Sequence, residues 1–193
     1  MRDLSRGHLA LLFASLAALI VMISFVGAST EANGCKNPPA ALAKFQPAEA
    51  AAPDSTVAFF QDGEREVTLA DWRGKGLVLN FWATWCAPCV EEMPALDALH
   101  ADVAGDGIAV LAISSDLGGA EAVRTFYDKQ GIEHLAVLTD PRSRMGQSFG
   151  VFGLPTTLLL DAEGQEVGRV LGAAEWNAPE VAAFLRACLT PAG

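Results

Sequence analysis

One short segment constrains the fold of this chain more than any other: Cys86 and Cys89 lie between a buried-strand pattern and a helical pattern. Residues 76–81 are the run Gly-Leu-Val-Leu-Asn-Phe, which predicts a buried strand. After the second cysteine, apolar residues recur between 93 and 103 with the spacing of one helix face. The sequence therefore predicts a strand–turn–helix unit with both thiols at the start of the helix.

The two thiols lie where a helix favours negative charge. Unpaired amides and the helix dipole lower the pKa of a thiol at a helix N-terminus, so we expect Cys86 to be a nucleophile near neutral pH. We expect Cys89, one turn into the helix, to be less accessible and to resolve a mixed disulfide formed by Cys86. Pro88 fits the first helical turn, where a missing N–H costs little. We expect Trp82, Trp85 and Pro88 to wall the site, with the two tryptophans excluding water.

Residues 80–89, Asn-Phe-Trp-Ala-Thr-Trp-Cys-Ala-Pro-Cys, are similar to the active-site segment of the thioredoxin superfamily. Within it, the chain resembles the TlpA-type membrane-anchored thiol–disulfide oxidoreductases, which are related to those of cytochrome c maturation. The resemblance runs from about Pro53 to Leu189. It implies a thioredoxin fold, a central mixed sheet flanked by helices, with an N-terminal β-hairpin and a central insertion at 115–149.

Strand and helix patterns alternate along the rest of the chain, which predicts a mixed α/β sheet with helices on both faces. A hairpin is expected over 56–68, followed by one helical turn over 69–72. Further strands are expected at 108–113, 135–138, 156–160 and 166–171, and helices at 119–130, 141–149 and 177–189. We expect 166–171 to be the edge strand of a hairpin and Asn177 to cap the last helix.

Pro155 directly precedes an apolar strand pattern, which is an unusual place for proline. The resemblance implies that Pro155 is the cis-proline of the superfamily, which packs opposite the two cysteines. It further implies that the backbone at Leu154 pairs with an extended client segment, in the manner of strand addition, and helps to wall the site. The alternative is a trans proline that only begins the strand.

The resolving thiol needs a proton acceptor. Thioredoxins place a buried aspartate beneath the site, and this chain has Asn80 at that position, which cannot take a proton. Glu92, three residues after Cys89, lies one helical turn further along and is our candidate for the catalytic proton acceptor, as the resemblance implies. The alternative is an exposed first-turn carboxylate that interacts only with the helix dipole.

The N-terminal part predicts a membrane anchor. Residues 9–28 form a run of about 20 uncharged residues, enough to cross a bilayer. Basic residues within 1–8 place the N-terminus in the cytoplasm. We expect a linker over 29–52 and a thioredoxin-like domain over 53–193 in the periplasm, held at the inner membrane. The alternative is a signal peptide cleaved after 26–28, although the apolar run exceeds the usual length.

Two further cysteines, Cys35 and Cys188, lie near opposite ends of the exported part. An even remaining pair in an exported protein predicts a disulfide, which would contribute on the order of 4–5 kcal/mol by the chain-entropy model. One alternative is two unrelated thiols. Another is lipid attachment at Cys35, which the preceding residues 32–34 fit poorly and which would preclude the bridge.

We expect a thiol–disulfide oxidoreductase, a monomer that needs no cofactor or metal ion. The resemblance favours a reductase of client proteins with cysteine pairs, such as apocytochrome c or copper-site proteins of oxidases. It also implies a membrane thiol donor of the DsbD or CcdA kind. The net charge of −10 argues against nucleic acid as a partner. One alternative is a Cu(I) metallochaperone that uses the C-x-x-C pair. A peroxidase of the peroxiredoxin group is disfavoured, because its Pro-x-x-x-Thr-x-x-Cys pattern is missing around Cys86.

Overall fold

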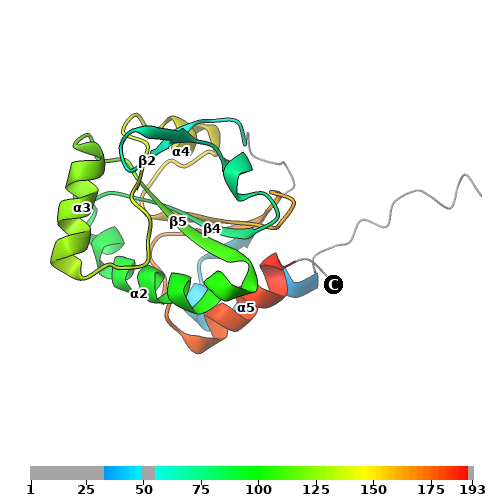
Figure 1. Ribbon diagram of the computed structural model, residues 1–193. Coiled ribbons are helices and arrows are strands. Elements are labelled where there is room, and N and C mark those ends of the chain that lie inside the picture. The colour runs from blue at the N-terminus through cyan, green and yellow to red at the C-terminus, as the bar shows by residue number, and fades with distance from the viewer. Residues whose placement is uncertain (1–32, 49–54, 191–193) are drawn as a thin grey trace, which may run out of the picture. The chain divides into compact units, whose positions relative to one another are not determined.

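A mixed sheet organises the part of the chain that the computed structural model describes, residues 33–48 and 55–190 (Figure 1). Its eight strands have the order β1-β8-β7-β4-β5-β6-β2-β3 within these residues. The strands are β1 (Phe45–Pro47), β2 (Phe59–Gln61), β3 (Arg65–Val67), β4 (Gly76–Trp82), β5 (Ile108–Ser114), β6 (Leu138–Thr139), β7 (Thr156–Leu160) and β8 (Glu166–Leu171). The α-helices are α2 (Ala87–Val103), α3 (Gly119–Gln130), α4 (Arg144–Ser148) and α5 (Pro179–Leu189), and the 3₁₀ turns are η1 (Asn33–Lys36), η2 (Ala40–Leu42), η3 (Leu69–Trp72) and η4 (Ala104–Asp106).

Helices cover both faces of the sheet, as the alternation of patterns predicted (Figure 1). Val78 and Trp82 of β4 belong to a hydrophobic cluster with residues of α2, α3 and α5. The alternate residues of the strand, Leu77 and Phe81 among them, pack on the other face with residues of α4, η3 and the β2–β3 hairpin. Because β4 is buried on both faces, it reads as a continuous apolar run rather than as alternating residues.

The predicted strand–turn–helix unit is confirmed. β4 lies in the middle of the sheet, parallel to β5 and antiparallel to β7, and all of its residues are buried. α2 begins at Ala87, with Cys86 as its N-cap residue and a proline in its first turn. The carboxyl end of a central strand therefore leads directly into the helix that carries Cys89.

Residues 33–48 differ from the linker that composition predicted over 29–52. They belong to the folded unit: Leu42 is buried, and β1 forms an antiparallel ladder with β8. A Cβ at Gly168 of β8 would overlap the ring of Phe45, so this glycine makes room for β1. The assignment of 166–171 as an edge strand is accordingly wrong, because β1 covers that edge.

Two boundaries also differ from expectation. The strand expected at 135–138 begins only at Leu138, because the buried carboxylate of Asp97 accepts the backbone N–H groups of residues 133–135 and holds them in a loop. Asn177 does not cap the last helix, whose N-cap residue is Ala178 without a side-chain hydrogen bond. The predicted hairpin, the turn at 69–72 and the helix at 119–130 are confirmed.

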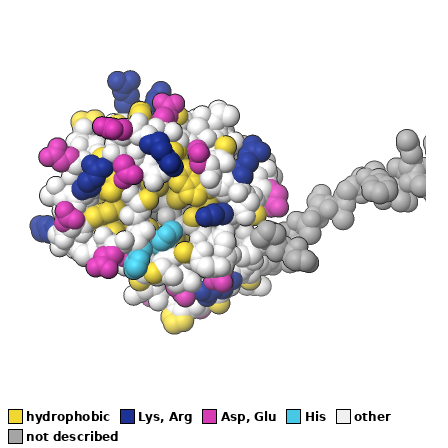
Figure 2. Space-filling view, in the orientation of Figure 1, with side chains coloured by type: hydrophobic (Ala, Val, Ile, Leu, Met, Phe, Trp, Pro, Cys, Tyr) yellow, Lys and Arg dark blue, Asp and Glu magenta, His cyan; other side chains and the backbone are white. Residues whose placement is uncertain are grey.

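The predicted cytoplasmic segment 1–8 and membrane span 9–28 lie outside the described residues. Within 33–48 and 55–190, no helix combines the length and the apolar character that crossing a membrane requires. Acidic and basic side chains are interspersed on the face drawn in Figure 2, with hydrophobic side chains between them. On that face, the net negative charge is therefore not gathered into a single acidic patch.

Candidate active site

Cys86 and Cys89 form a disulfide at the start of α2, with their Cα atoms 5.3 Å apart. Cys86 is 7% exposed and Cys89 is fully buried, so the two sulfurs differ in access in the predicted order. The Cys86 carbonyl accepts the Val90 amide at 3.0 Å, which begins the helical hydrogen-bond series. The attacking sulfur therefore lies next to the free amides of the helix N-terminus, where a thiolate is stabilised.

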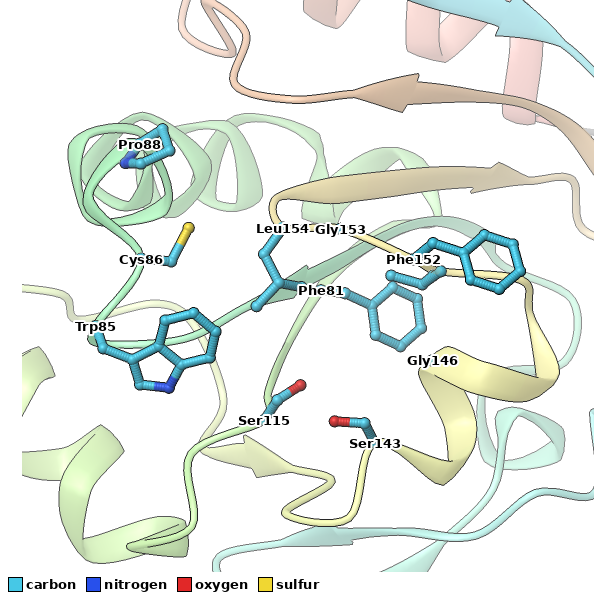
Figure 3. A pocket seen from close by; sticks show the side chains of 11 residues that line it. Phe81, Trp85, Cys86, Pro88, Ser115, Ser143, Gly146, Phe152, Gly153 and Leu154 are labelled. Carbon is cyan, nitrogen blue, oxygen red and sulfur yellow. The ribbon is translucent and has the colours of Figure 1, made fainter.

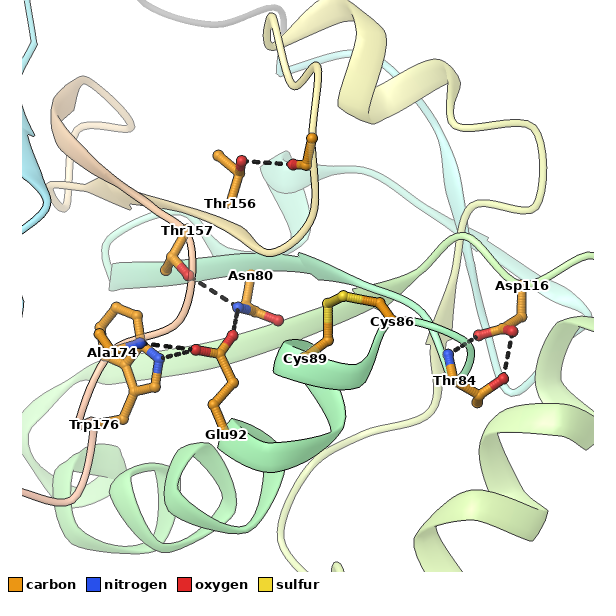
Figure 4. The surroundings of a disulfide bond; sticks show 11 residues. Asn80, Thr84, Cys86, Cys89, Glu92, Asp116, Thr156, Thr157, Ala174 and Trp176 are labelled. Atoms are coloured by element: carbon orange, nitrogen blue, oxygen red, sulfur yellow. Dashed lines mark hydrogen bonds between the residues drawn. A yellow bond between two sulfur atoms is a disulfide. The ribbon is translucent and has the colours of Figure 1, made fainter.

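The turn before Cys86 is held by the neighbouring strand. The buried carboxylate of Asp116 accepts the Thr84 amide at 2.9 Å and the Thr84 hydroxyl at 2.6 Å. Figure 4 shows these two bonds to Thr84. Asp116 also accepts the hydroxyl of Ser114, the last residue of β5, at 2.7 Å. Asp116 was not predicted as a site residue. The available signal was its place just after a strand parallel to β4, because the carboxyl ends of parallel strands meet at one edge of a sheet.

A pocket of about 540 Å³ opens beside Cys86. Figure 3 shows Cys86 and Leu154 facing one another across it, with Pro88 and Trp85 on the helix side. Trp85 is 71% exposed and Phe152 is 98% exposed, so apolar side chains line a site that remains open to solvent. The pocket can take an extended apolar segment next to the accessible sulfur.

Trp82 does not wall this pocket, contrary to expectation. Its ring is fully buried on the α3 side of the sheet, 5.0 Å from the Phe126 ring and stacked 6.0 Å from the Tyr127 ring, measured between centroids. The reason is the alternation of a strand, in which Trp82 shares a face with Val78 and not with Phe81, which lines the pocket. Phe152, which does line it, was not predicted, and its only signal was its place just before Leu154 and Pro155.

The peptide bond between Leu154 and Pro155 is cis, as the resemblance implied. Leu154 lines the pocket beside Cys86, and the Thr156 hydroxyl donates to the Gly153 carbonyl at 2.7 Å, which fixes the turn around the proline. The structure therefore brings Leu154 and Cys86 together at one pocket. The pairing of the Leu154 backbone with a client stays a prediction.

Glu92 is 4% exposed, so its interpretation as an exposed first-turn carboxylate is wrong. The Asn80 amide donates to Glu92 Oε1 at 2.9 Å, and the Trp176 indole N–H donates to Oε2 at 2.8 Å. The Ala174 backbone N–H donates to the same Oε2 at 3.2 Å (Figure 4). These donors satisfy a carboxylate that has left water, as a buried charge requires.

Burial raises the pKa of Glu92, because desolvation disfavours its ionised form. The hydrogen bonds from Trp176, Asn80 and Ala174, together with the positive charge of Lys44, act against that rise in pKa. Trp176 and Ala174 were not predicted, and a single sequence carries no local signal that links them to Glu92, which lies 84 and 82 positions earlier. Glu92 is thus a buried carboxylate on the helix that carries Cys89, and its pKa depends on the balance between burial and these hydrogen bonds.

The structure joins Cys35 of η1 to Cys188 of α5 by a disulfide, with Cα atoms 4.8 Å apart and 153 positions between them. No cysteine is free, and all four lie within the described residues. In the same residues, no three His, Cys, Asp or Glu side chains are grouped closely enough to hold a metal ion.

The comparison with family models matches residues 48–166 to the AhpC/TSA family. One curated relative is the thiol-disulfide oxidoreductase ResA of Bacillus thuringiensis (strain Al Hakam), 34% identical over 108 residues. That match covers 56% of this chain and 61% of the relative, so the chain spans less than two thirds of it. Another is the thiol:disulfide interchange protein HelX of Rhodobacter capsulatus, 35% identical over 158 residues, which are 80% of this chain and 84% of HelX.

Solved structures show the same architecture. A protein described as the thiol:disulfide interchange protein DsbE from Chlorobium tepidum matches with a TM-score of 0.60 and 26% identity, covering 71% of this chain and 98% of that one. The exposed lipoprotein thioredoxin Etrx1 from Streptococcus pneumoniae matches with a TM-score of 0.54 and 28% identity, covering 63% and 93%. These similarities confirm the thioredoxin-like α/β fold that residues 80–89 predicted.

Proposed function

Because this chain belongs to the AhpC/TSA family, we propose that it is a thiol–disulfide oxidoreductase that works through Cys86 and Cys89. The observation that carries the proposal is the disulfide at the start of α2, whose Cys86 side opens into a pocket while Cys89 is buried. The helix N-terminus activates the sulfur that a client can reach, and the buried sulfur is protected from competing reactions.

The exchange runs in two steps. In the reduced protein, the Cys86 thiolate attacks one sulfur of a client disulfide, which forms a mixed disulfide and releases the other client sulfur as a thiolate. Cys89 then loses its proton and attacks the Cys86 sulfur. This second attack restores the Cys86–Cys89 disulfide and releases the client as a dithiol, so two electrons pass from the protein to the client.

We further propose that the chain is a membrane-tethered reductase in the periplasm. The apolar run at 9–28 supports the tether. The Cys35–Cys188 disulfide supports an exported location, since such bonds persist in oxidising compartments. Its clients would be proteins with cysteine pairs, in cytochrome c or copper-oxidase biogenesis, and it would act as a monomer. A reductase outside the cytoplasm needs electrons, which a membrane thiol donor of the DsbD or CcdA kind would supply.

The reduction potential of the Cys86–Cys89 pair tests this proposal and its direction. We expect equilibration with a reference dithiol to give a potential as negative as that of thioredoxin, about −270 mV, or lower. A value near about −120 mV would make the protein an oxidant instead. Mass spectrometry of alkylated protein reports whether the pair becomes reduced. If the pair stayed oxidised at every ratio of reduced to oxidised reference dithiol, the oxidoreductase proposal itself would be wrong.

Glu92→Gln should slow the resolving step on the order of a hundredfold near neutral pH, because a positioned base is lost. In the parent protein, the rate should rise as pH increases through the raised pKa of Glu92, since only the carboxylate accepts the Cys89 proton. The rate of the variant should lack that rise. It should increase only at the higher pH at which the Cys89 thiol loses its proton to solvent without help from a carboxylate. Single-turnover kinetics between about pH 4 and 9 measure both effects.

The neighbouring, exposed Glu91 provides the matched control for that experiment. Glu91→Gln removes the same charge from the same helix turn without touching the buried network, and it should leave the profile unchanged. If the Glu92 and Glu91 variants gave the same rate–pH profile as the parent protein, Glu92 would have no part in the mechanism.

A further inference from the structure

Asn80 carries a buried oxygen atom that has no hydrogen-bond partner. The side chain is fully buried in β4, and its amide nitrogen donates to Glu92 Oε1 and to Thr157 Oγ1, each at 2.9 Å. An ionised carboxylate can only accept, so the contact with Glu92 identifies that end of the amide as the nitrogen. Its oxygen, Oδ1, is one of two buried side-chain polar atoms in the described residues that lack a partner. A buried acceptor without a partner destabilises the fold and is rare in native proteins, so it calls for an explanation.

The free oxygen lies on the side of Asn80 that faces the disulfide. Figure 4 shows the amide nitrogen turned toward Glu92 and Thr157 and the oxygen turned toward Cys89. The geometry of α2 agrees with this view. Cys89 and Glu92 are one turn apart on the same helix face, and Glu92 is already in direct contact with the Asn80 nitrogen. Cys89 therefore lies on the same side of α2 as the residue that the Asn80 amide already contacts.

In the oxidised protein, Cys89 has no proton to donate, because its sulfur is bonded to Cys86. We propose that Asn80 Oδ1 accepts a hydrogen bond from the Cys89 thiol once this disulfide is reduced, so that Asn80 stabilises the dithiol form. This inference rests on the proposed function and adds a residue to it. Asn80 Oδ1 therefore has no partner in the oxidised protein and has the Cys89 thiol as its partner in the reduced protein.

A donor dithiol breaks the Cys86–Cys89 bond and is itself oxidised to a disulfide, so two electrons enter the pair. Of the two protons that the donor dithiol loses, one goes to Cys89 and the other to solvent. Cys86 ends as a thiolate at the helix N-terminus, and Cys89 donates its new proton in a hydrogen bond to Asn80 Oδ1. The same Asn80 amide donates to Glu92. Asn80 therefore holds the Cys89 proton beside the carboxylate that removes it in the resolving step.

Asn80→Ala tests the proposal through the redox equilibrium. The substitution removes the acceptor for the thiol and the orphan oxygen of the disulfide form, and both changes favour the oxidised protein. The equilibrium constant for reduction should fall about three- to tenfold. A tenfold fall corresponds to roughly 30 mV toward more negative potential for this two-electron couple. Loss of the bonds to Glu92 and Thr157 acts on both redox states and so does not move this equilibrium.

Thr157→Val is the matched control. It removes one partner of the Asn80 nitrogen in the same buried place and leaves the oxygen untouched. It should therefore change the equilibrium constant less than twofold or so, within ordinary mutational scatter. An unchanged constant in Asn80→Ala, or an equal fall in both variants, would refute the role of the oxygen.

A second measurement observes the hydrogen bond of the Cys89 thiol directly. In full-length Cys86→Ser protein with the Cys35–Cys188 bridge intact, Cys89 is the only thiol, and infrared spectroscopy reports its S–H stretch. We expect the band to lie at lower frequency in the folded protein than in the same protein unfolded by denaturant. A band at the unfolded position would overturn the proposal. So would a shifted band that Glu92→Gln abolishes and Asn80→Ala leaves in place, because Glu92 would then be the acceptor.

These outcomes are separable from a failure of the proposed function. The infrared band does not depend on exchange with any client. Conversely, a Cys86–Cys89 pair that cannot be reduced would refute the proposed function before the Asn80 experiment began. A pair that can be reduced, but whose equilibrium constant is the same with and without the Asn80 side chain, would refute only the role of Asn80.

Discussion

Cys89→Ser should convert the protein from a turnover catalyst into one that stops at a mixed disulfide. The reduced variant still presents the Cys86 thiolate at the helix N-terminus, so the first attack on a client disulfide proceeds. A serine hydroxyl cannot displace the client sulfur, and the buried position of residue 89 keeps other thiols away. Multiple turnover should therefore fall on the order of a thousandfold or more, while the covalent complex accumulates. Steady-state reduction of a client disulfide measures the first effect, and non-reducing electrophoresis with mass spectrometry of the complex measures the second.

Cys86→Ser is the opposite variant and serves as the control. It leaves Cys89, which is fully buried and does not line the pocket, as the only thiol of the pair. This variant should form no covalent complex at a comparable rate. If adducts formed as readily through Cys89, the assignment of attacking and resolving sulfurs would have to be reversed.

The sequence predicts those parts of this site whose structure depends on residues close together in the chain. The apolar run of β4, the two cysteines and the helical spacing after them lie within one continuous segment, so their arrangement follows from neighbouring residues alone. The same is true of the turn at Leu69–Trp72, where the Asp71 carboxylate accepts the Thr68 amide within a capping box.

The parts that the sequence does not predict depend on contacts between distant segments. Trp176 and Ala174 reach Glu92 from the loop between β8 and α5, and nothing around either residue distinguishes it from an ordinary core or loop residue. Asp116 is similar, since its role depends on the parallel pairing of β4 with β5. Residues 33–48 have a composition typical of a linker, and only their pairing with β8 gives them a fixed structure.

Residues 33–48 also connect the second disulfide to the site. The Ala41 carbonyl accepts the Glu175 amide at 3.4 Å, next to Ala174, which donates to Glu92. The Lys44 carbonyl accepts the Leu171 amide, and the charge of Lys44 counteracts part of the rise that burial causes in the pKa of Glu92. Residues 33–48, which the disulfide of Cys35 links to α5, therefore contact the loop between β8 and α5. That loop provides two of the three hydrogen-bond donors to the Glu92 carboxylate.

Replacing Cys35 and Cys188 together with alanine should destabilise the fold more than any other change considered above. The bridge spans 153 positions, so its loss frees nearly the whole domain in the unfolded state and costs about 5 kcal/mol by the chain-entropy model. That is a large fraction of the roughly 5–15 kcal/mol that stabilises a typical domain. Chemical denaturation of the oxidised proteins, followed by circular dichroism, measures the difference in free energy of unfolding.

Cys86→Ser/Cys89→Ser is the matched control, because it also removes one disulfide. Its cysteines are only three positions apart, and the same model assigns that short loop about 2 kcal/mol. The long bridge should therefore account for more than twice the loss of the short one. Equal losses in the two variants would mean that η1 and β1 stay on α5 and β8 through packing alone. In that case the burial of Leu42 and the Phe45–Phe184 ring contact at 5.7 Å, rather than the covalent link, would hold the segment against the Glu92 loop.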